Sequence, residues 1–351
     1  MMKSNNIQVF FGLLITTILL ISGCGKGDEA TAPQQTAMQK DQSMTPSEPS
    51  MSNTQGLPDI VSFNKQALYP EGVEYDSSGH RFLVTSMREG IVGTVTPDGK
   101  YSVLFQDKRM VSAVGIRIDK DHDRVLVCNS DPGVSVHTSP ETKGKLAGLA
   151  VFQLSTGSLI KYIDLAGLSD GGGHFCNDIA LDSNGVAYVS DSFSPIIYKV
   201  AADNVASVFL QDVKFAGEGF GFNGLVVKDD YLLVAKYNDG TLFKLPLSDP
   251  HQFSQVTMDA SYPGADGLLW TADGALILIA NANTNKVLKL TSDDNWASAK
   301  VAGAVDTGQV FATTGKEING NVYVLHAMLH VLFNPEAKEQ VGTFEIQKII
   351  F

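Results

Sequence analysis

The sequence predicts an all-β fold, and specifically a six-bladed β-propeller. From Leu57 onward, short apolar runs rich in β-branched and aromatic residues alternate with Gly, Asp and Asn turns, and no stretch keeps a 3.6-residue apolar period. Similar dipeptides precede six of these runs, at separations of 43, 63, 46, 43 and 48 residues. Such spacing is typical of the four-stranded blades of a propeller. A pair of β-sandwiches is the alternative.

Each dipeptide is expected to open the innermost strand of one blade. The six are Glu71-Gly72, Val114-Gly115, Asn177-Asp178, Asn223-Gly224, Asp266-Gly267 and Thr314-Gly315. In the first unit the dipeptide is followed by an apolar strand at 73–75, a Ser-Ser-Gly turn and a second strand at 82–85, and the third unit repeats this scheme at 179–190. The longer second interval indicates an insertion, which we place in the polar segment 131–145.

Residues 1–23 are expected to form a lipoprotein signal peptide. The 13-residue hydrophobic run at 9–21 is too short to span a bilayer comfortably. It ends in Ile21-Ser22-Gly23-Cys24, which resembles the bacterial lipobox, so Cys24 is the predicted lipidation site. Gly25 rather than Asp follows, which in a Gram-negative host indicates an anchor in the outer membrane, facing the periplasm. An ordinary signal peptide with an incidental cysteine is the alternative.

Residues 24–56 are expected to be the lipidated cysteine and a disordered tether. Positions 25–56 contain no Val, Ile, Leu, Phe, Tyr or Trp, and 16 of the 32 are Ser, Thr, Pro or Gln. Such a segment cannot bury enough apolar surface to offset the entropy of ordering. The propeller is therefore expected to occupy residues 57–351.

Charge and cysteine content narrow the function classes. There are 26 Lys and Arg against 38 Asp and Glu, and a net charge of −12 argues against nucleic-acid binding. We expect a monomer with a small-molecule substrate. Cys128 and Cys176 lie in neighbouring blades and are expected to be buried free thiols, with a disulfide as the alternative in an oxidising compartment.

Four of the six dipeptides place an oxygen-bearing side chain at the start of the innermost strand. These strands line the central channel, so equivalent positions in different blades converge on one ring. The four residues are Glu71, Asn177, Asn223 and Asp266. Two carboxylates and two amides are hard oxygen donors that suit calcium, whereas zinc is disfavoured because the ring has no His or Cys. The alternative is that Asn-Gly and Asp-Gly are merely turn formers.

On these residues the chain, from about position 69 to 332, resembles the senescence marker protein/gluconolactonase/luciferin-regenerating enzyme family. More distantly it resembles paraoxonases and diisopropylfluorophosphatase, all of which are six-bladed calcium-dependent hydrolases. The matching segments, in order and at blade spacing, are Pro70-Glu71-Gly72, Cys176-Asn177-Asp178, Asn223-Gly224-Leu225 and Asp266-Gly267-Leu268.

The resemblance implies a calcium-dependent hydrolase of a lactone or related ester. It implies that Asp266 acts as base or nucleophile, and that Asn177 and Asn223 hold the metal and orient the substrate. Phe175 stands where gluconolactonase-like members often have an Arg for sugar contacts, so a more apolar lactone or ester is expected. The alternative is a non-catalytic propeller that keeps calcium for rigidity and binds a ligand or partner.

Hairpin geometry adds a second set of candidates. The second strand of each blade runs antiparallel to the first, so it ends at the face where the ring begins. The residues at those ends are predicted to contact substrate, namely Arg88, Asn129, Asp191, Lys236, Asn281 and His326. His174, three residues before Asn177, is a further candidate acid or base.

One tempting motif is set aside on its context. Gly167-Leu168-Ser169-Asp170-Gly171 matches the G-x-S-x-G nucleophile elbow, but that elbow requires a helix directly after the serine. Here Gly172, Gly173 and His174 follow, so the sequence does not favour a serine hydrolase.

Overall fold

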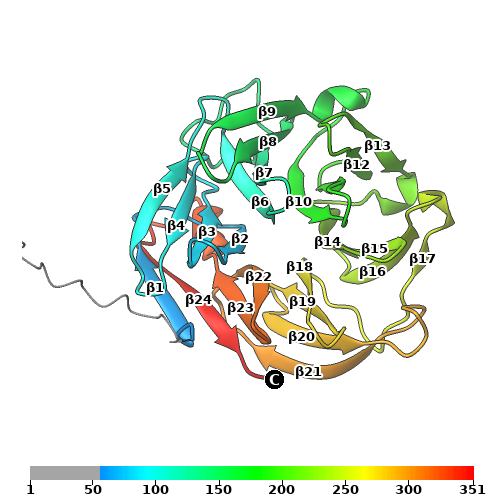
Figure 1. Cartoon of the computed structure of the whole chain (residues 1–351). Coiled ribbons are helices and arrows are strands. Elements are labelled where there is room, and N and C mark those ends of the chain that lie inside the picture. Colours follow the sequence, from blue (N-terminus) through cyan, green and yellow to red (C-terminus); the bar gives the residue numbers. More distant parts are fainter. Residues whose placement is uncertain (1–55) are drawn as a thin grey trace, which may run out of the picture. The chain divides into compact units, whose positions relative to one another are not determined.

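The computed structural model describes residues 56–351. The predicted signal peptide, the lipidated Cys24 and nearly all of the predicted tether lie outside the described residues. In the described part, 24 strands form six four-stranded antiparallel sheets around a central axis (Figure 1). The predicted fold class, an all-β six-bladed propeller, is confirmed. No helix of residues 56–351 is long and apolar enough to cross a membrane.

The first five blades each use four consecutive strands. Blade one contains β2 (Val73–Asp76), β3 (Arg81–Thr85), β4 (Val92–Val95) and β5 (Tyr101–Phe105). Blade two contains β6 (Ser112–Asp119), β7 (Arg124–Ser130), β8 (Ala147–Gln153) and β9 (Leu159–Asp164). Blade three contains β10 (Cys176–Leu181), β11 (Ala187–Asp191), β12 (Ile196–Val200) and β13 (Ala206–Gln211). Blade four contains β14 (Phe222–Lys228), β15 (Tyr231–Lys236), β16 (Thr241–Pro246) and β17 (Ser254–Gln255). Blade five contains β18 (Ala265–Trp270), β19 (Leu276–Ala280), β20 (Lys286–Thr291) and β21 (Lys300–Asp306).

The sixth blade joins the two ends of the folded domain. It contains β22 (Ala312–Ile318), β23 (Asn321–His326), β24 (Thr343–Ile349) and, as its outer strand, β1 (Ile60–Asn64). β1 lies beside β24 in Figure 1 and pairs antiparallel with it. The rings of Phe63 and Phe344 pack 6.0 Å apart between their centroids. The N-terminal strand therefore closes the ring, a contact that the repeat pattern did not predict.

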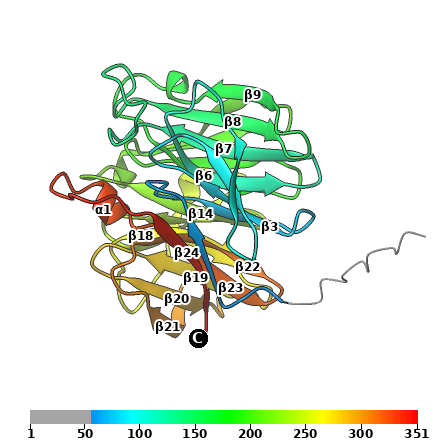
Figure 2. The ribbon, with the colours of Figure 1, turned by 90° about the vertical axis from the view of Figure 1, so that its left-hand side faces the viewer.

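Short helices occupy four of the connections. The 3-10 helices are η1 (Ala166–Leu168), η2 (Val213–Phe215) and η3 (Pro250–Gln252), and the one α-helix of the described chain is α1 (Leu329–Leu332), which projects at one face (Figure 2). The blades pack face to face through apolar side chains, as the stacked rings of Phe105 and Phe152 show across blades one and two, 4.9 Å apart. The insertion expected at 131–145 is the connection between β7 and β8.

The repeated glycines are explained by close approach between blades rather than by turns. A Cβ atom at Gly224 would lie 2.1 Å from the Asp266 carbonyl oxygen, and one at Gly72 would lie 2.5 Å from the Val114 carbonyl oxygen. Neither glycine has a positive φ, so conformational freedom is not the reason for them. The innermost strands meet so tightly at the ring that only a hydrogen atom fits there. The turn-former interpretation is therefore wrong for these glycines.

Cys128 and Cys176 form a disulfide, so the expectation of two free thiols is wrong. β7 of blade two and β10 of blade three bring the two Cα atoms to 5.3 Å, within the range that a disulfide requires. The two cysteines are 48 residues apart, and only the packing of one blade on the next brings them together.

Replacing both cysteines with alanine should lower the free energy of unfolding by about 3–4 kcal/mol, because the unfolded chain is no longer constrained by the cross-link. Chemical denaturation of the double variant and the parent checks this. The parent treated with reductant under denaturing conditions and refolded in reductant is the control, and it should match the double variant. Equal stability of the oxidised parent and the variant would contradict the prediction.

Candidate functional site

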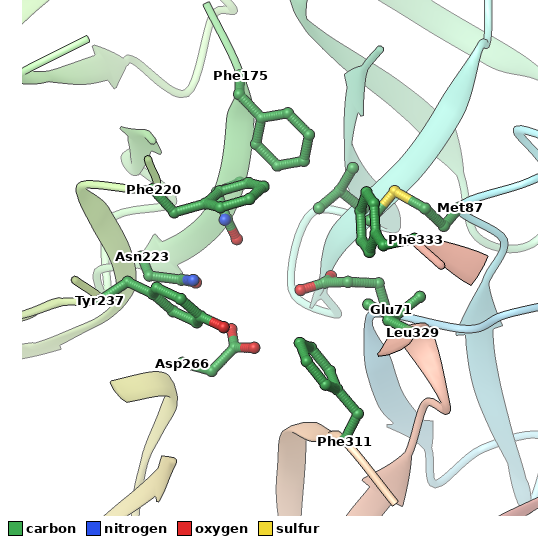
Figure 3. A pocket seen from close by; sticks show the side chains of 12 residues that line it. Glu71, Met87, Phe175, Phe220, Asn223, Tyr237, Asp266, Phe311, Leu329 and Phe333 are labelled. Carbon is green, nitrogen blue, oxygen red and sulfur yellow. The ribbon is translucent and has the colours of Figure 1, made fainter. Parts of the chain in front are cut away.

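A cavity on the central axis collects the predicted ring residues. Its lining residues come from all six blades and their connections, and they are Glu71, Met87, Val114, Phe175, Asn177, Phe220, Asn223, Tyr237, Asp266, Phe311, Leu329 and Phe333. In Figure 3 the carboxyl groups of Glu71 and Asp266 and the amide of Asn223 point into the same space. The four predicted oxygen-bearing residues therefore share one cavity, together with Val114 of blade two.

Bulges in the innermost strands direct these side chains inward. The register with the second strand shifts between Cys176 and Ile179, between Phe222 and Leu225, and between Ala265 and Leu268. Each interval contains one ring residue, and a bulge re-aims the side chain that it carries. Hydroxyl groups of the second strands satisfy the displaced backbone, since Ser190 Oγ accepts from the Asp178 N–H at 3.1 Å. In blade one, Thr85 Oγ1 accepts from the Gly72 N–H at 2.7 Å.

Asp266 is held by a chain of hydrogen bonds. Asn281 Nδ2 donates to Asp266 Oδ2, and Tyr237 donates its hydroxyl proton to Asn281 Oδ1 at 2.7 Å. Asn281 is fully buried, so its position is fixed by packing as well. Asn281, which is predicted as a substrate contact, donates to this carboxylate and does not line the axial cavity itself.

Asn177 presents an unsatisfied oxygen. Its Nδ2 donates to Ser192 Oγ at 2.8 Å, whereas its Oδ1 has no hydrogen-bond partner among residues 56–351. The residue is only 4% exposed, and a buried polar atom without a partner is costly. Because Asn177 lines the cavity, this oxygen has the position and the chemistry of a ligand for a cation.

The two carboxyl groups of the cavity repel one another. Burial raises the pKa of Glu71 well above its ordinary value, and the carboxylates of Asp266 and Asp178 raise it further, while Arg117 opposes the shift. Burial likewise raises the pKa of Asp266, against the hydrogen bond from Asn281. Two buried like charges of this kind are stabilised by a bound cation.

An adjoining layer of charges is balanced within itself. Arg117 lies 3.3 Å from Asp178 and 3.8 Å from Glu74, and Lys316 lies 2.7 Å from Glu74. Arg117, Lys316 and Glu74 line a second cavity, together with Glu317. No Lys, Arg or His among residues 56–351 forms an ion pair with Glu71 or Asp266, so the two carboxyl groups fit a divalent cation. Among residues 56–351 no three His, Cys, Asp or Glu side chains form a cluster, so the amides are needed to complete the ligand set.

The rest of the cavity wall is apolar and largely aromatic. Phe175 packs against Phe220 and Phe193 at 5.3 and 5.1 Å between ring centroids, and Phe220 packs against Tyr237 at 5.8 Å. Figure 3 shows Phe311 and Phe333 on the opposite side. The cavity volume is about 40 Å³, and a water needs about 10–15 Å³. The base of the site thus has room for an ion with one or two waters, and a larger ligand would have to sit toward the mouth.

Part of this wall was missed by the sequence analysis. Leu329 and Phe333 belong to the connection between β23 and β24, which contains α1, and Phe311 precedes β22. Phe311 stacks on His330 with ring centroids 6.2 Å apart, so the two connections support one another. The sequence does contain a signal for this part of the wall. It is the apolar run that follows His326, because the repeat pattern assigns that run to no blade strand.

The remaining predicted substrate contacts lie around the site rather than in it. Arg88 lines a neighbouring cavity that shares Phe333 with the axial one and includes residues of the 131–145 insertion, and it donates to the Val134 carbonyl at 3.4 Å. Lys236 pairs with Asp239 at 2.7 Å. Asn129 is fully buried, accepts from the Val111 N–H and donates to Tyr162, so it supports blade two and does not line the axial cavity.

His326 also lies outside the lining of the axial cavity. It is buried, its Nδ1 lies 3.6 Å from Glu345, and its Nε2 has no partner among the described residues. Burial lowers its pKa, so the neutral ring is favoured at neutral pH.

His174 and Asp191 contact one another. His174 Nδ1 lies 2.7 Å from Asp191 Oδ2, and both residues are buried. The hydrogen bond that His174 makes to the Asp191 carboxylate raises the pKa of His174, and burial opposes this shift. The pair stands directly beside Phe175, at the edge of the cavity wall.

Fold and site together define a six-bladed propeller with an acidic, oxygen-rich cavity on its axis. No protein-family model and no curated protein matches the sequence. Three solved structures share the fold across most of their length. They are the major allergen Mala s 1 of Malassezia sympodialis (16% identity, TM-score 0.65, 84% of this chain and 96% of that one), a luciferin-regenerating enzyme (11%, 0.57, 82% and 95%) and a gluconolactonase from Xanthomonas campestris (13%, 0.57, 83% and 89%). The resemblance drawn from the sequence motifs is confirmed at the level of the fold.

Proposed function

We propose that this protein is a calcium-dependent hydrolase of lactones or related esters. The observation that carries the proposal is the donor set of the axial cavity, in which two buried carboxylates meet two amides and one amide oxygen lacks a partner. Hard oxygen donors with a summed charge of −2 suit Ca²⁺, and another small divalent cation would suit the same set. Fold similarity to a gluconolactonase adds support by analogy only.

The ligands would be Glu71, Asn177, Asn223 and Asp266. When bound, calcium would polarise a carbonyl oxygen and stabilise the negative charge that develops on it. Asn281 and Asn223 hydrogen-bond the Asp266 carboxylate and orient it, and this carboxylate would take a proton from the attacking water. Asn177 is fixed by Ser192, which keeps its oxygen directed at the same place.

The apolar side chains that line the cavity above the two carboxylates indicate the substrate class. Apart from Glu71 and Asp266, no charged side chain lines the axial cavity, and most of the other lining residues are aromatic or aliphatic. Phe175 in particular is buried where a sugar-binding arginine would stand. A lactone with an alkyl chain buries apolar surface here, whereas a sugar-acid lactone would leave hydroxyl groups without partners.

A panel of lactones tests the proposal. Hydrolysis of an alkyl lactone should require calcium, should stop with a chelator and should exceed hydrolysis of gluconolactone at least tenfold. Phe175→Arg should reduce the rate on the alkyl lactone, while Phe351→Arg, at the exposed C-terminus, is the matched control. Calcium binding without hydrolysis of any lactone or ester would favour the alternative, a calcium-stabilised propeller that binds a ligand or a partner.

We further propose that the propeller is displayed on a membrane as a lipoprotein anchored through Cys24. The signal-peptide pattern is the main support. The disulfide between Cys128 and Cys176 adds to it, because such bonds persist in oxidising compartments such as the periplasm.

A further inference from the structure

The connection between β9 and β10 places a serine, a histidine and an aspartate side chain in contact, one after the other. Ser169 Oγ lies 3.4 Å from His174 Nε2, and His174 Nδ1 lies 2.7 Å from Asp191 Oδ2. The sequence analysis set Ser169 aside because no helix follows it. In the structure a different local geometry brings the serine to the histidine, and the order along the chain is Ser, His, Asp.

Glycine makes this geometry accessible. Gly171 and Gly172 have φ values of 66° and 102°, which glycine adopts at little cost, and they turn the chain back so that His174 reaches Ser169. His174 is then fixed by its backbone, whose N–H donates to the Gly144 carbonyl at 3.0 Å. The tight turn thus positions the serine next to the histidine, as a strand-to-helix elbow does in other folds.

Asp191 is built to orient an imidazole. Its Oδ1 accepts from the N–H groups of Phe175, Phe193 and Ser194 at 2.9, 3.0 and 3.1 Å. Its Oδ2 accepts from the Tyr198 hydroxyl at 3.0 Å and faces His174. These contacts give both carboxylate oxygens hydrogen-bond partners, although the residue is fully buried.

The carboxylate also fixes the tautomer of His174. An ionised carboxylate only accepts hydrogen bonds, so Nδ1 carries the proton and Nε2 of the neutral ring is the acceptor that faces Ser169. When the ring takes a second proton, the Gly171 carbonyl joins Asp191 in stabilising it. His174 can therefore both take and return a proton at Nε2.

We propose that Ser169, His174 and Asp191 form a second, metal-independent esterase site, in which Ser169 is an acylated nucleophile. Ser169 Oγ attacks the ester carbonyl carbon and gives its proton to His174 Nε2; the bond to the alcohol oxygen breaks, and that oxygen takes the proton. Water then attacks the acyl-serine ester, gives a proton to His174, and Ser169 leaves with that proton as the carboxylic acid is released. No oxidant, reductant or cofactor enters.

The surroundings define the ester that this site accepts. Ser169 is partly exposed, and the exposed N–H groups of Gly171 and Gly172, which donate to no residue among 56–351, are the donors nearest in sequence for the carbonyl oxygen. Asp170 and Asp164 are exposed acidic neighbours in the chain. They disfavour anionic substrates, so we infer a small neutral or cationic ester.

Labelling with a fluorophosphonate tests the proposal on the full chain in the presence of a calcium chelator. One label per chain is expected, on the peptide that contains Ser169, with matching turnover of p-nitrophenyl acetate. Ser169→Ala should abolish both, and His174→Gln should slow labelling at least ~100-fold. Ser183→Ala removes an exposed hydroxyl in the turn between β10 and β11, away from these three residues, and should label like the parent.

Because Ser169 is partly exposed, its alanine variant should keep the melting temperature of the parent, which separates a chemical role from a structural one. A parent that takes no label, or a Ser169→Ala variant that labels at the parent rate, would overturn the proposal. The chelator makes this outcome independent of the axial site, whose lactonase activity requires calcium.

Discussion

Asp266→Asn should abolish calcium binding in the axial cavity and lower kcat/KM for the alkyl lactone by about three orders of magnitude. The change keeps the size of the side chain but removes one of the two cavity carboxylates, and with it the group that takes the proton. A loss of about 4 kcal/mol in transition-state stabilisation corresponds to this factor. Calorimetric titration with calcium and steady-state kinetics on the same preparation check both parts.

Two further variants make the result specific. Glu71→Gln removes the other cavity carboxylate, which lies outside the hydrogen-bond chain of Tyr237 and Asn281, so it should lose calcium affinity as Asp266→Asn does. Asp230→Asn removes an exposed carboxylate in the turn between β14 and β15 and should behave as the parent. If Asp266→Asn retained calcium affinity, the ion would have to bind elsewhere and the proposed ligand set would be refuted.

The ring residues could be found from the sequence because the blades repeat. Asn177, Asn223 and Asp266 occupy equivalent positions 46 and 43 residues apart, and rotation about the propeller axis turns equal positions into neighbours. The glycines beside two of them follow from the same crowding, since the innermost strands of neighbouring blades almost touch. The positions of residues that recur once per blade could therefore be predicted in three dimensions.

Features that break the repeat could not be found in this way. The disulfide depends on the packing of blade two on blade three, and closure of the ring depends on β1 pairing with β24 at the far end of the chain. Leu329 and Phe333 reach the cavity from a connection whose path no blade pattern determines. Second-strand ends such as Asn129 and Asn281 lie at the expected ends of β7 and β19, but each is used to hold the protein together.

Ser169 shows the limit of a motif taken without its geometry. The requirement for a helix after the serine is sound for one fold, yet positive φ values at two glycines bring the histidine close by another route. A motif specifies residue types, whereas the alignment of donor and acceptor depends on backbone angles that the sequence indicates only through its glycines.

Removing calcium should destabilise the propeller, and more strongly at pH 8 than at pH 5. In the calcium-free protein burial raises the pKa values of Glu71 and Asp266, and neighbouring carboxylates raise them further, Asp266 and Asp178 acting on Glu71 and Asp178 on Asp266. As pH rises above the ordinary carboxyl pKa near 4, the unfolded chain loses its protons first and the folded protein retains more. The contribution of these two groups is therefore fully present at low pH and is lost as pH rises through their folded-state pKa values.

Bound calcium would oppose this loss because it would take the place of the protons between the two carboxylates. At a thousandfold excess over its Kd, it should add about 4 kcal/mol to the free energy of unfolding. Denaturation curves at pH 5, 7 and 8, with calcium and with chelator, measure the effect. The double variant Glu71→Gln/Asp266→Asn lacks both carboxyl groups. The difference in the free energy of unfolding between this variant and the parent therefore reports these two groups alone, apart from all other titrations. In chelator that variant should be more stable than the parent at pH 8. If the difference in the free energy of unfolding between variant and parent did not change with pH, the two carboxylates would not be destabilised by burial in the calcium-free fold.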